Sequence, residues 1–187
     1  MEIRSFEPRL DEAAAVGRTE RLTVPTYLRS KLRGLLGRSP EPESITRLYY
    51  PDYIAYTTVE FDRLARGEKT VKFLAAVDAV TGRVGEVDLE LPERETLEVP
   101  DGRVLPIEVP EEGATEAWRE WLFPYLDRSY RPVRRPESTL DRLELVYTPF
   151  LIVDYGEEGE RYAVSTLTKQ VELLEDVEAL EAGYDPA

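Results

Sequence analysis

Two stretches of the chain share a tyrosine, a proline and an isoleucine at the same spacing, and this match restricts the fold more than any other feature. Arg-Leu-Tyr-Tyr-Pro-Asp-Tyr-Ile-Ala at 47–55 returns as Leu-Val-Tyr-Thr-Pro-Phe-Leu-Ile-Val at 145–153. After each copy a second strand-like run ends in a comparable turn, at 77–84 and at 164–171. The prolines are 98 positions apart and the turns 87, so the first copy has the longer connection. The pattern predicts a duplicated unit, which indicates architecture and a shared surface more than a chemistry.

Alternation and turn residues predict antiparallel strands in each copy. In 53–61 every second residue is apolar or threonine, and 71–77 follows the same rule, so each run presents one face to a core. Asp78-Ala79-Val80-Thr81-Gly82 reads as a tight turn in which Gly82 supplies a positive φ.

A helix is predicted before each strand block. Leucines at 28, 32, 35 and 36 form one apolar face after the Thr23-Val24-Pro25 start. A second helix follows Thr115, with Trp118 and Trp121 on its apolar stripe. The predicted fold is therefore α+β, with two similar helix-plus-antiparallel-strand units packed as one compact body. The first unit covers residues 1–92, and the second covers 93–187 with an acidic hairpin insertion and a C-terminal tail.

The helix, the aromatic-proline strand and the turn together resemble the PepSY type of small α+β module, possibly present here as two tandem copies. Asp78, Ala79, Thr81, Gly82 and Val84 carry the resemblance. The second copy departs from it at two places, where Ser165 replaces the aspartate and Lys169 the glycine. The resemblance implies a non-catalytic module, often linked to inhibiting or regulating peptidases and usually found outside the membrane.

The composition excludes several kinds of chemistry. The chain has no His and no Cys, so the usual general base, zinc ligand and thiolate nucleophile are absent. No phosphate-binding loop or dinucleotide fingerprint is found, so neither a cofactor nor a metal is expected and no catalytic residue is assigned. A carboxylate pair such as Asp154 with Glu160 remains as a candidate for acid–base work, or as the charged tip of a hairpin.

The net charge of −14 argues against binding to nucleic acid or to an anionic membrane. No apolar run is long enough to span a bilayer, and the first residues lack the apolar region of a secretory signal. We therefore expect a cytoplasmic protein. The acid-rich, lysine-poor composition is also typical of proteins from salt-loving organisms, where salt screens the repulsion.

Two arginine-rich segments stand out against this charge. One lies within 21–38, and the other consists of Arg128, Arg131, Arg134 and Arg135. Such segments bind an acidic partner, a phosphate or a nucleic acid backbone, or else pair with the acidic middle of the same chain or of a sister subunit. The tyrosines of the strands form a ligand platform or pack in the core. The candidate partner-binding residues are Tyr49, Tyr53, Tyr56, Tyr147, Arg29, Arg33, Arg131 and Arg134.

These observations predict a non-catalytic binding or regulatory module of unknown ligand. Its partner would be another protein or a second copy of the chain. An exposed sheet edge could mediate the pairing with either partner. The alternative is a carboxylate-based or metal-dependent hydrolase with its site between the two predicted units. That alternative requires acids that converge in a concave pocket with raised carboxyl pKa values.

Overall fold

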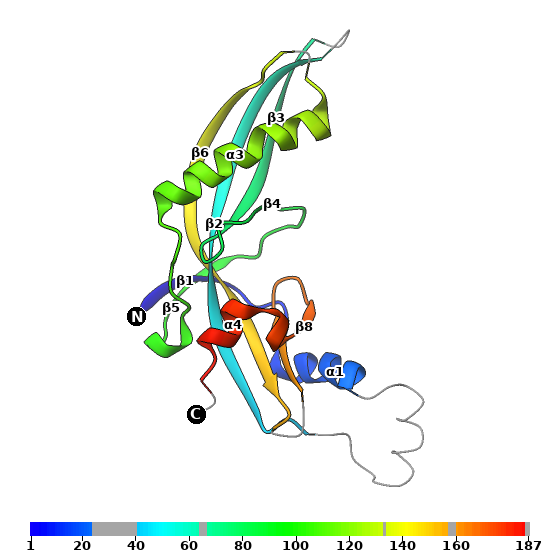
Figure 1. Cartoon of the computed structure of the whole chain (residues 1–187), viewed down its shortest axis with the longest axis vertical. Coiled ribbons are helices and arrows are strands. Elements are labelled where there is room, and N and C mark those ends of the chain that lie inside the picture. The colour runs from blue at the N-terminus through cyan, green and yellow to red at the C-terminus, as the bar shows by residue number, and fades with distance from the viewer. Residues whose placement is uncertain (24–40, 64–66, 133, 157–159, 186–187) are drawn as a thin grey trace. The chain divides into compact units, whose positions relative to one another are not determined.

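The computed structural model describes residues 1–23, 41–63, 67–132, 134–156 and 160–185 (Figure 1). Its strands are β1 (Glu2–Phe6), β2 (Ser44–Arg63), β3 (Gly67–Asp78), β4 (Val84–Glu86), β5 (Arg94–Glu98), β6 (Glu137–Asp154), β7 (Arg161–Ser165) and β8 (Val171–Leu173). Its helices are α1 (Glu12–Thr23), α3 (Glu111–Tyr130) and α4 (Glu178–Gly183), with short 3₁₀ turns at Asp101–Arg103 and Leu174–Asp176. The described chain is therefore mostly β.

All these strands belong to one mixed sheet. The order is β4-β3-β2-β6-β1-β5, and β7 pairs with both β6 and β8. β1 runs parallel to β6, whereas β2–β3, β3–β4, β6–β7 and β7–β8 are antiparallel.

The predicted fold of two similar helix-plus-antiparallel-strand units packed as one compact body is wrong. The physical reason is the length of β2 and β6, which have 20 and 18 residues. Pairing along these long strands organises the described chain, and α3, from the predicted second unit, packs on β2 and β3 of the predicted first unit. The predicted helix over 23–36 lies almost wholly outside the described residues.

The described chain divides into two compact units, each built from separate segments. Unit 1 comprises Met1–Tyr50, Pro92–Leu105 and Tyr147–Ala187, and unit 2 comprises Pro51–Leu91 and Pro106–Val146. β2 and β6 each contribute residues to both. The division of the chain into 1–92 and 93–187 stays a prediction.

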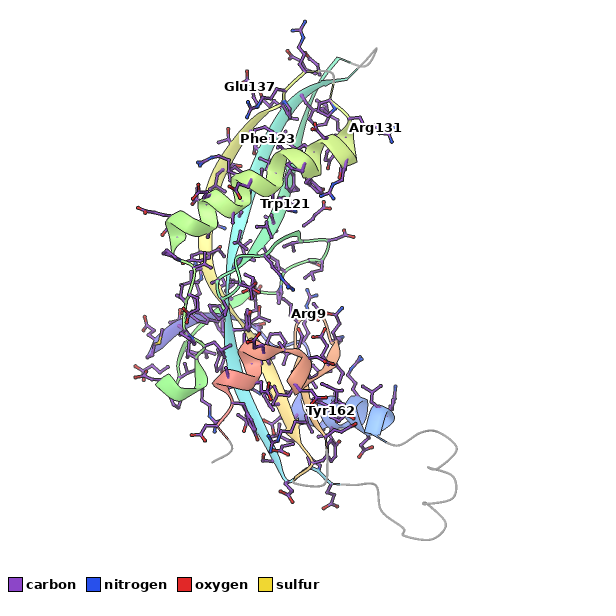
Figure 2. The ribbon with its side chains drawn as sticks, viewed as in Figure 1. Arg9, Trp121, Phe123, Arg131, Glu137 and Tyr162 are labelled. Carbon is purple, nitrogen blue, oxygen red and sulfur yellow. The ribbon has the colours of Figure 1, made fainter. Side chains whose placement is uncertain are left out.

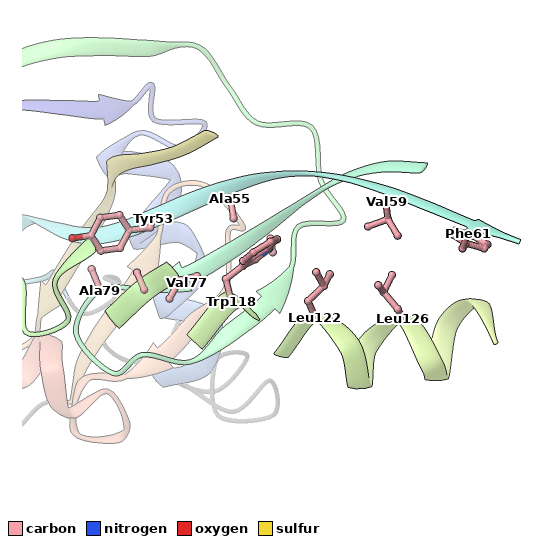
Figure 3. Close-up of a cluster of buried hydrophobic side chains, with 11 residues drawn as sticks. Tyr53, Ala55, Val59, Phe61, Val77, Ala79, Trp118, Leu122 and Leu126 are labelled. Carbon is pink, nitrogen blue, oxygen red and sulfur yellow. The ribbon is translucent and has the colours of Figure 1, made fainter. Parts of the chain in front are cut away.

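The core of unit 2 lies between α3 and one face of its strands. Tyr53, Ala55, Val59 and Phe61 of β2 are buried together with the apolar face of the helix, as the alternation predicted (Figure 3). Trp118 of α3 is buried there, and its indole Nε1 donates a hydrogen bond to Thr57 Oγ1 at 3.0 Å. The helix thus covers one face of the unit 2 strands with an apolar contact and one buried polar contact.

Aromatic rings extend this core along the helix. The rings of Trp121 and Tyr125 stack with centroids 4.5 Å apart, and the Phe73 ring of β3 lies 5.4 Å from Tyr125. Burial, followed by hydrogen bonds to Glu86 and Tyr130, raises the pKa of Tyr125 far above its ordinary value of 10.0. The phenol is therefore held in its neutral form.

Unit 1 has a separate core. Leu151 and Val153 of β6 and Val164 of β7 are buried with Leu10 and Ala15, so α1 packs on these strands. Alternating apolar residues on β6 and β7 account for the shared face.

Two three-strand runs, β2–β3–β4 and β6–β7–β8, have the same pairing register. Tyr53 pairs with Val77 in the first run as Leu151 pairs with Val164 in the second. The following pairs also agree: Val77 with Val84, and Val164 with Val171. Even the turn contacts agree, because Ala79 N donates to Pro51 O at 3.2 Å and Thr166 N to Pro149 O at 3.1 Å. The two runs are geometrically alike, and duplication of the chain stays a prediction.

Candidate functional site

Three of the tyrosines that were predicted to bind a partner lie in the interior. Tyr49, Tyr53 and Tyr147 are only 7%, 5% and 4% exposed, respectively. A binding platform needs accessible rings, whereas these three residues are buried, Tyr53 in the core that α3 covers. The burial of Tyr53, with the nearby Glu111 carboxylate, raises the pKa of its phenol.

Tyr56 lies on the face of β2 opposite α3 and is half-buried. The Arg142 guanidinium carbon lies 4.0 Å from the centre of its ring, and the Tyr56 hydroxyl donates to Glu144 Oε2 at 3.2 Å. Arg142 also forms an ion pair with Glu144 at 3.1 Å. Arg142 and Glu144 neutralise each other beside a groove that Tyr56 and Arg142 line, so the group lacks the excess charge that would attract an ion. Arg29 and Arg33 lie outside the described residues.

The second arginine-rich segment is exposed at the end of α3. We call Arg128, Arg131, Arg134 and Arg135 the arginine cluster; all four are exposed. Arg128 Nε donates to the Pro124 carbonyl at 3.1 Å, and the Arg135 guanidinium carbon lies 4.4 Å from the centre of the Phe123 ring. Among the described residues, no carboxylate forms an ion pair with any of the four. Pairing of these four arginines with the acidic middle of the same chain is therefore not observed among the described residues.

A hollow of about 380 Å³ is lined by two members of the arginine cluster, Arg134 and Arg135. Figure 2 shows Phe123 along α3, Arg131 at the end of this helix and Glu137 at the start of β6. The lining consists of Phe123, Asp127, Pro132, Arg134, Arg135 and Pro136. The two guanidinium groups outnumber the one carboxylate, Asp127, and lie beside apolar ring surfaces, so the hollow suits a carboxylate or phosphate that is attached to an apolar chain.

Arg131 adopts an unusual backbone conformation. It ends α3 with φ 47 and ψ 59, in the left-handed region that glycine or asparagine usually fills at this position. A residue with a β-carbon costs about 1 kcal/mol there. The chain thus keeps an arginine at a strained helix end, which supports a role for its side chain outside local folding.

The carboxylate pair Asp154 and Glu160 has structural partners. Asp154 accepts hydrogen bonds from Gly156 N at 2.8 Å, Arg161 Nε at 3.1 Å and the Tyr184 hydroxyl at 3.0 Å. Glu160 accepts a hydrogen bond from the Tyr162 hydroxyl. The contacts of Asp154 hold a turn and a nearby tyrosine in place. The hydrolase alternative stays a prediction.

The described residues contain no group of three or more Asp or Glu side chains placed to hold a metal ion. No helix in the described ranges is long and apolar enough to cross a membrane.

Comparison with known proteins gave no match to a protein-family model, a curated protein or a solved structure. The resemblance to PepSY modules therefore stays a prediction.

Sequence reasoning found the arginine cluster but missed the hollow and its aromatic wall. Arg131 and Arg134 were predicted as binding residues from their number in an acidic chain. Phe123 could have been found only from its spacing, since it precedes Asp127 by one helical turn on the side away from the buried Leu122 and Leu126. Pro132 and Pro136 meet that helical turn only in the folded chain, so no local sequence pattern could have predicted the hollow.

Proposed function

We propose that this protein is a non-catalytic binding or regulatory module that uses the arginine cluster to bind an acidic segment of a partner protein. One observation carries the proposal: four exposed arginines have no ion-pair partner in the described chain, although the net charge is −14. Acids outnumber bases by 38 to 24, so carboxylates are abundant. Arginines left unpaired under these conditions favour an anion from outside.

The size of the arginine cluster favours a short acidic segment. A nucleic acid continues well beyond four arginines and would meet the acidic remainder of the surface. A peptide with a few carboxylates fits within the cluster. At about 0.1 M salt the Debye length is near 10 Å, so more distant acids are screened while contacts in the hollow persist.

The proposal includes two points from the sequence alone. We place the module in the cytoplasm because a chain without cysteine gains nothing from an oxidising compartment. The resemblance of the Asp78–Val84 turn to PepSY modules supports a regulatory role.

Binding to a fluorescein-labelled acidic peptide tests the proposal, with fluorescence anisotropy as the readout in about 0.1 M salt. We expect Arg131→Ala and Arg134→Ala each to weaken binding about fivefold, because each removes one charge-assisted contact worth about 1 kcal/mol. Arg119→Ala is the matched control, since Arg119 is an exposed arginine of the same helix outside the arginine cluster.

Two outcomes contradict the proposal. Equal weakening by Arg119→Ala would mean that net charge alone governs binding. Stronger binding to a single-stranded RNA oligonucleotide of equal charge would favour nucleic acid as the partner.

A further inference from the structure

We propose that the acidic segment binds as an added strand on the outer edge of β6, next to the arginine cluster. This inference rests on the proposed function and specifies how the partner is held. Main-chain hydrogen bonds to an exposed strand edge would give affinity, and the arginines would select the acidic end.

The first part of β6 has a free edge. β2 pairs with one side of the strand, whereas β1 pairs with the other side only at Tyr147 and β7 only from Phe150 to Asp154. Residues 137–146 thus have no strand on their outer side among the described elements. This length corresponds to about 33 Å of strand. Figure 1 shows this part of β6 at the rim of the unit 2 strands.

The edge is also accessible and stiff. Glu137, Thr139, Asp141 and Arg142 are exposed, whereas Leu140 and Leu143 pack against the core under α3. Since both leucines face the same side although they are three residues apart, the strand has an irregular step between them. Packing by α3 fixes the backbone, so an incoming strand need not order it.

The hollow and the free edge are continuous. Pro136, which lines the hollow, directly precedes Glu137, the first residue of β6. An extended segment can therefore place carboxylates beside Arg134 and Arg135 while its remaining residues follow β6. Glu137 and Asp141 would repel further acids along the strand, so that part of the segment should be uncharged and β-forming. Antiparallel pairing is preferred, which puts the acidic residues at the C-terminal end of the segment.

Alternate N-methylation of the peptide backbone tests strand addition. The probe has about twelve residues, alternating threonine and serine followed by four acidic residues at its C-terminus. In an added strand every second N–H points toward β6. We expect N-methylation of one alternate set to weaken binding about tenfold or more, since several hydrogen bonds of about 0.5–1.5 kcal/mol are lost. Methylation of the other set should change binding less than about twofold.

Amide hydrogen exchange locates the added strand. We expect the peptide to slow exchange at alternate amides of 137–140 and of 143–146, on either side of the irregular step. The matched control is the outer edge of β3 before Leu74, which also lacks a paired strand, because β4 pairs only with Ala75–Val77 and Val87 N donates to Leu74 O. Protection at that edge, or equal tolerance of both methylated sets, would overturn strand addition.

The outcomes separate this inference from the proposed function. If Arg131→Ala and Arg134→Ala weaken binding but neither methylated set does, the arginine cluster binds acidic segments without adding a strand. If neither arginine variant has an effect, the proposed function itself fails. Protection of 137–146 that rises with protein concentration and without peptide would assign the edge to a second copy of the chain and overturn the acidic segment as occupant.

Discussion

At the scale of single residues, Lys169 is in a conformation that suits glycine. Its φ is 63, and the residue at the same place in the earlier turn, Gly82, has φ 74. Both turns are closed by the same bond, Gly82 N to Asp78 O and Lys169 N to Ser165 O, each at 2.9 Å. Both turns therefore require a positive φ at this position. Gly82 adopts it without strain, whereas Lys169 does not.

We predict that Lys169→Gly raises the unfolding free energy by about 0.5–1 kcal/mol, because relief of strain exceeds the entropy that glycine adds to the unfolded chain. Urea denaturation followed by tryptophan fluorescence measures this change. Lys169→Ala removes the same charge but keeps a β-carbon, so it should leave stability nearly unchanged. A gain with alanine as large as that with glycine would assign the effect to charge.

The bond between Trp118 and Thr57 is the second residue-scale feature that can be tested. Both residues are buried, 4% and 1% exposed, so Thr57→Val leaves the indole N–H without its 3.0 Å partner. We predict a loss of about 1–3 kcal/mol of stability. In a Trp118→Phe background the same change should cost little, because no donor remains. Urea unfolding of all four proteins gives the coupling energy, and a coupling near zero would contradict this assignment.

The burial of the tyrosines could be predicted from the sequence only in part. The alternation around Tyr53, Ala55, Thr57, Val59 and Phe61 correctly indicated the face covered by α3. For Tyr49 and Tyr147 the sequence could not say which strand face is covered, because that depends on segments distant in the chain. Leu105 N, for example, donates to the Tyr49 carbonyl at 3.0 Å.

At the scale of elements, α3 is held to the unit 2 strands by aromatic rings whose chemistry depends on pH. The pKa of Tyr125 is raised in the folded chain, first by burial and then by hydrogen bonds to Glu86 and Tyr130. The unfolded chain therefore loses this proton near pH 10, whereas the folded chain keeps it. Stability from Tyr125 is complete below that pH and is lost as the pH rises further.

We predict that Tyr125→Phe makes the alkaline loss of stability shallower, since phenylalanine has no proton to lose. Urea unfolding at pH 8 and at about pH 10.5 measures the difference. Trp121→Phe is the control, because it changes a ring that stacks on Tyr125 without removing a titratable proton, so it should leave the alkaline slope unchanged. An unchanged alkaline slope for Tyr125→Phe would mean that Tyr125 does not couple α3 to pH.

Turns and strands were the elements that the sequence predicted best. The Asp78–Gly82 turn was recognised from local chemistry, and the structure confirms the positive φ of Gly82. β1 was missed because its five residues include Glu2, Arg4 and Ser5, which look like a polar lead-in. The position of β1 beside β6 and β5 comes from pairing across about a hundred residues or more, for which no local pattern exists.

At the scale of the whole molecule, charge repulsion is the dominant electrostatic feature. Within the described ranges, ion pairs include those of Met1 with Asp101, Arg47 with Glu12, Arg142 with Glu144, and Arg161 with Asp154. The first two are exposed on both sides and contribute little. The remaining acids repel one another, and the folded chain holds them closer than the unfolded chain does.

We therefore predict that added KCl stabilises the protein, with the steepest gain below about 0.2 M, where the Debye length shortens most. Urea midpoints at a series of KCl concentrations measure the effect. A variant with Glu93→Gln, Glu108→Gln and Glu172→Gln is the control, because these exposed acids lie outside the helices and have no ion pair in the described chain. It should be more stable at low salt and respond less to KCl. Stability that falls with salt would mean that attraction within ion pairs outweighs repulsion, and would remove the physical basis for the predicted salt-loving origin.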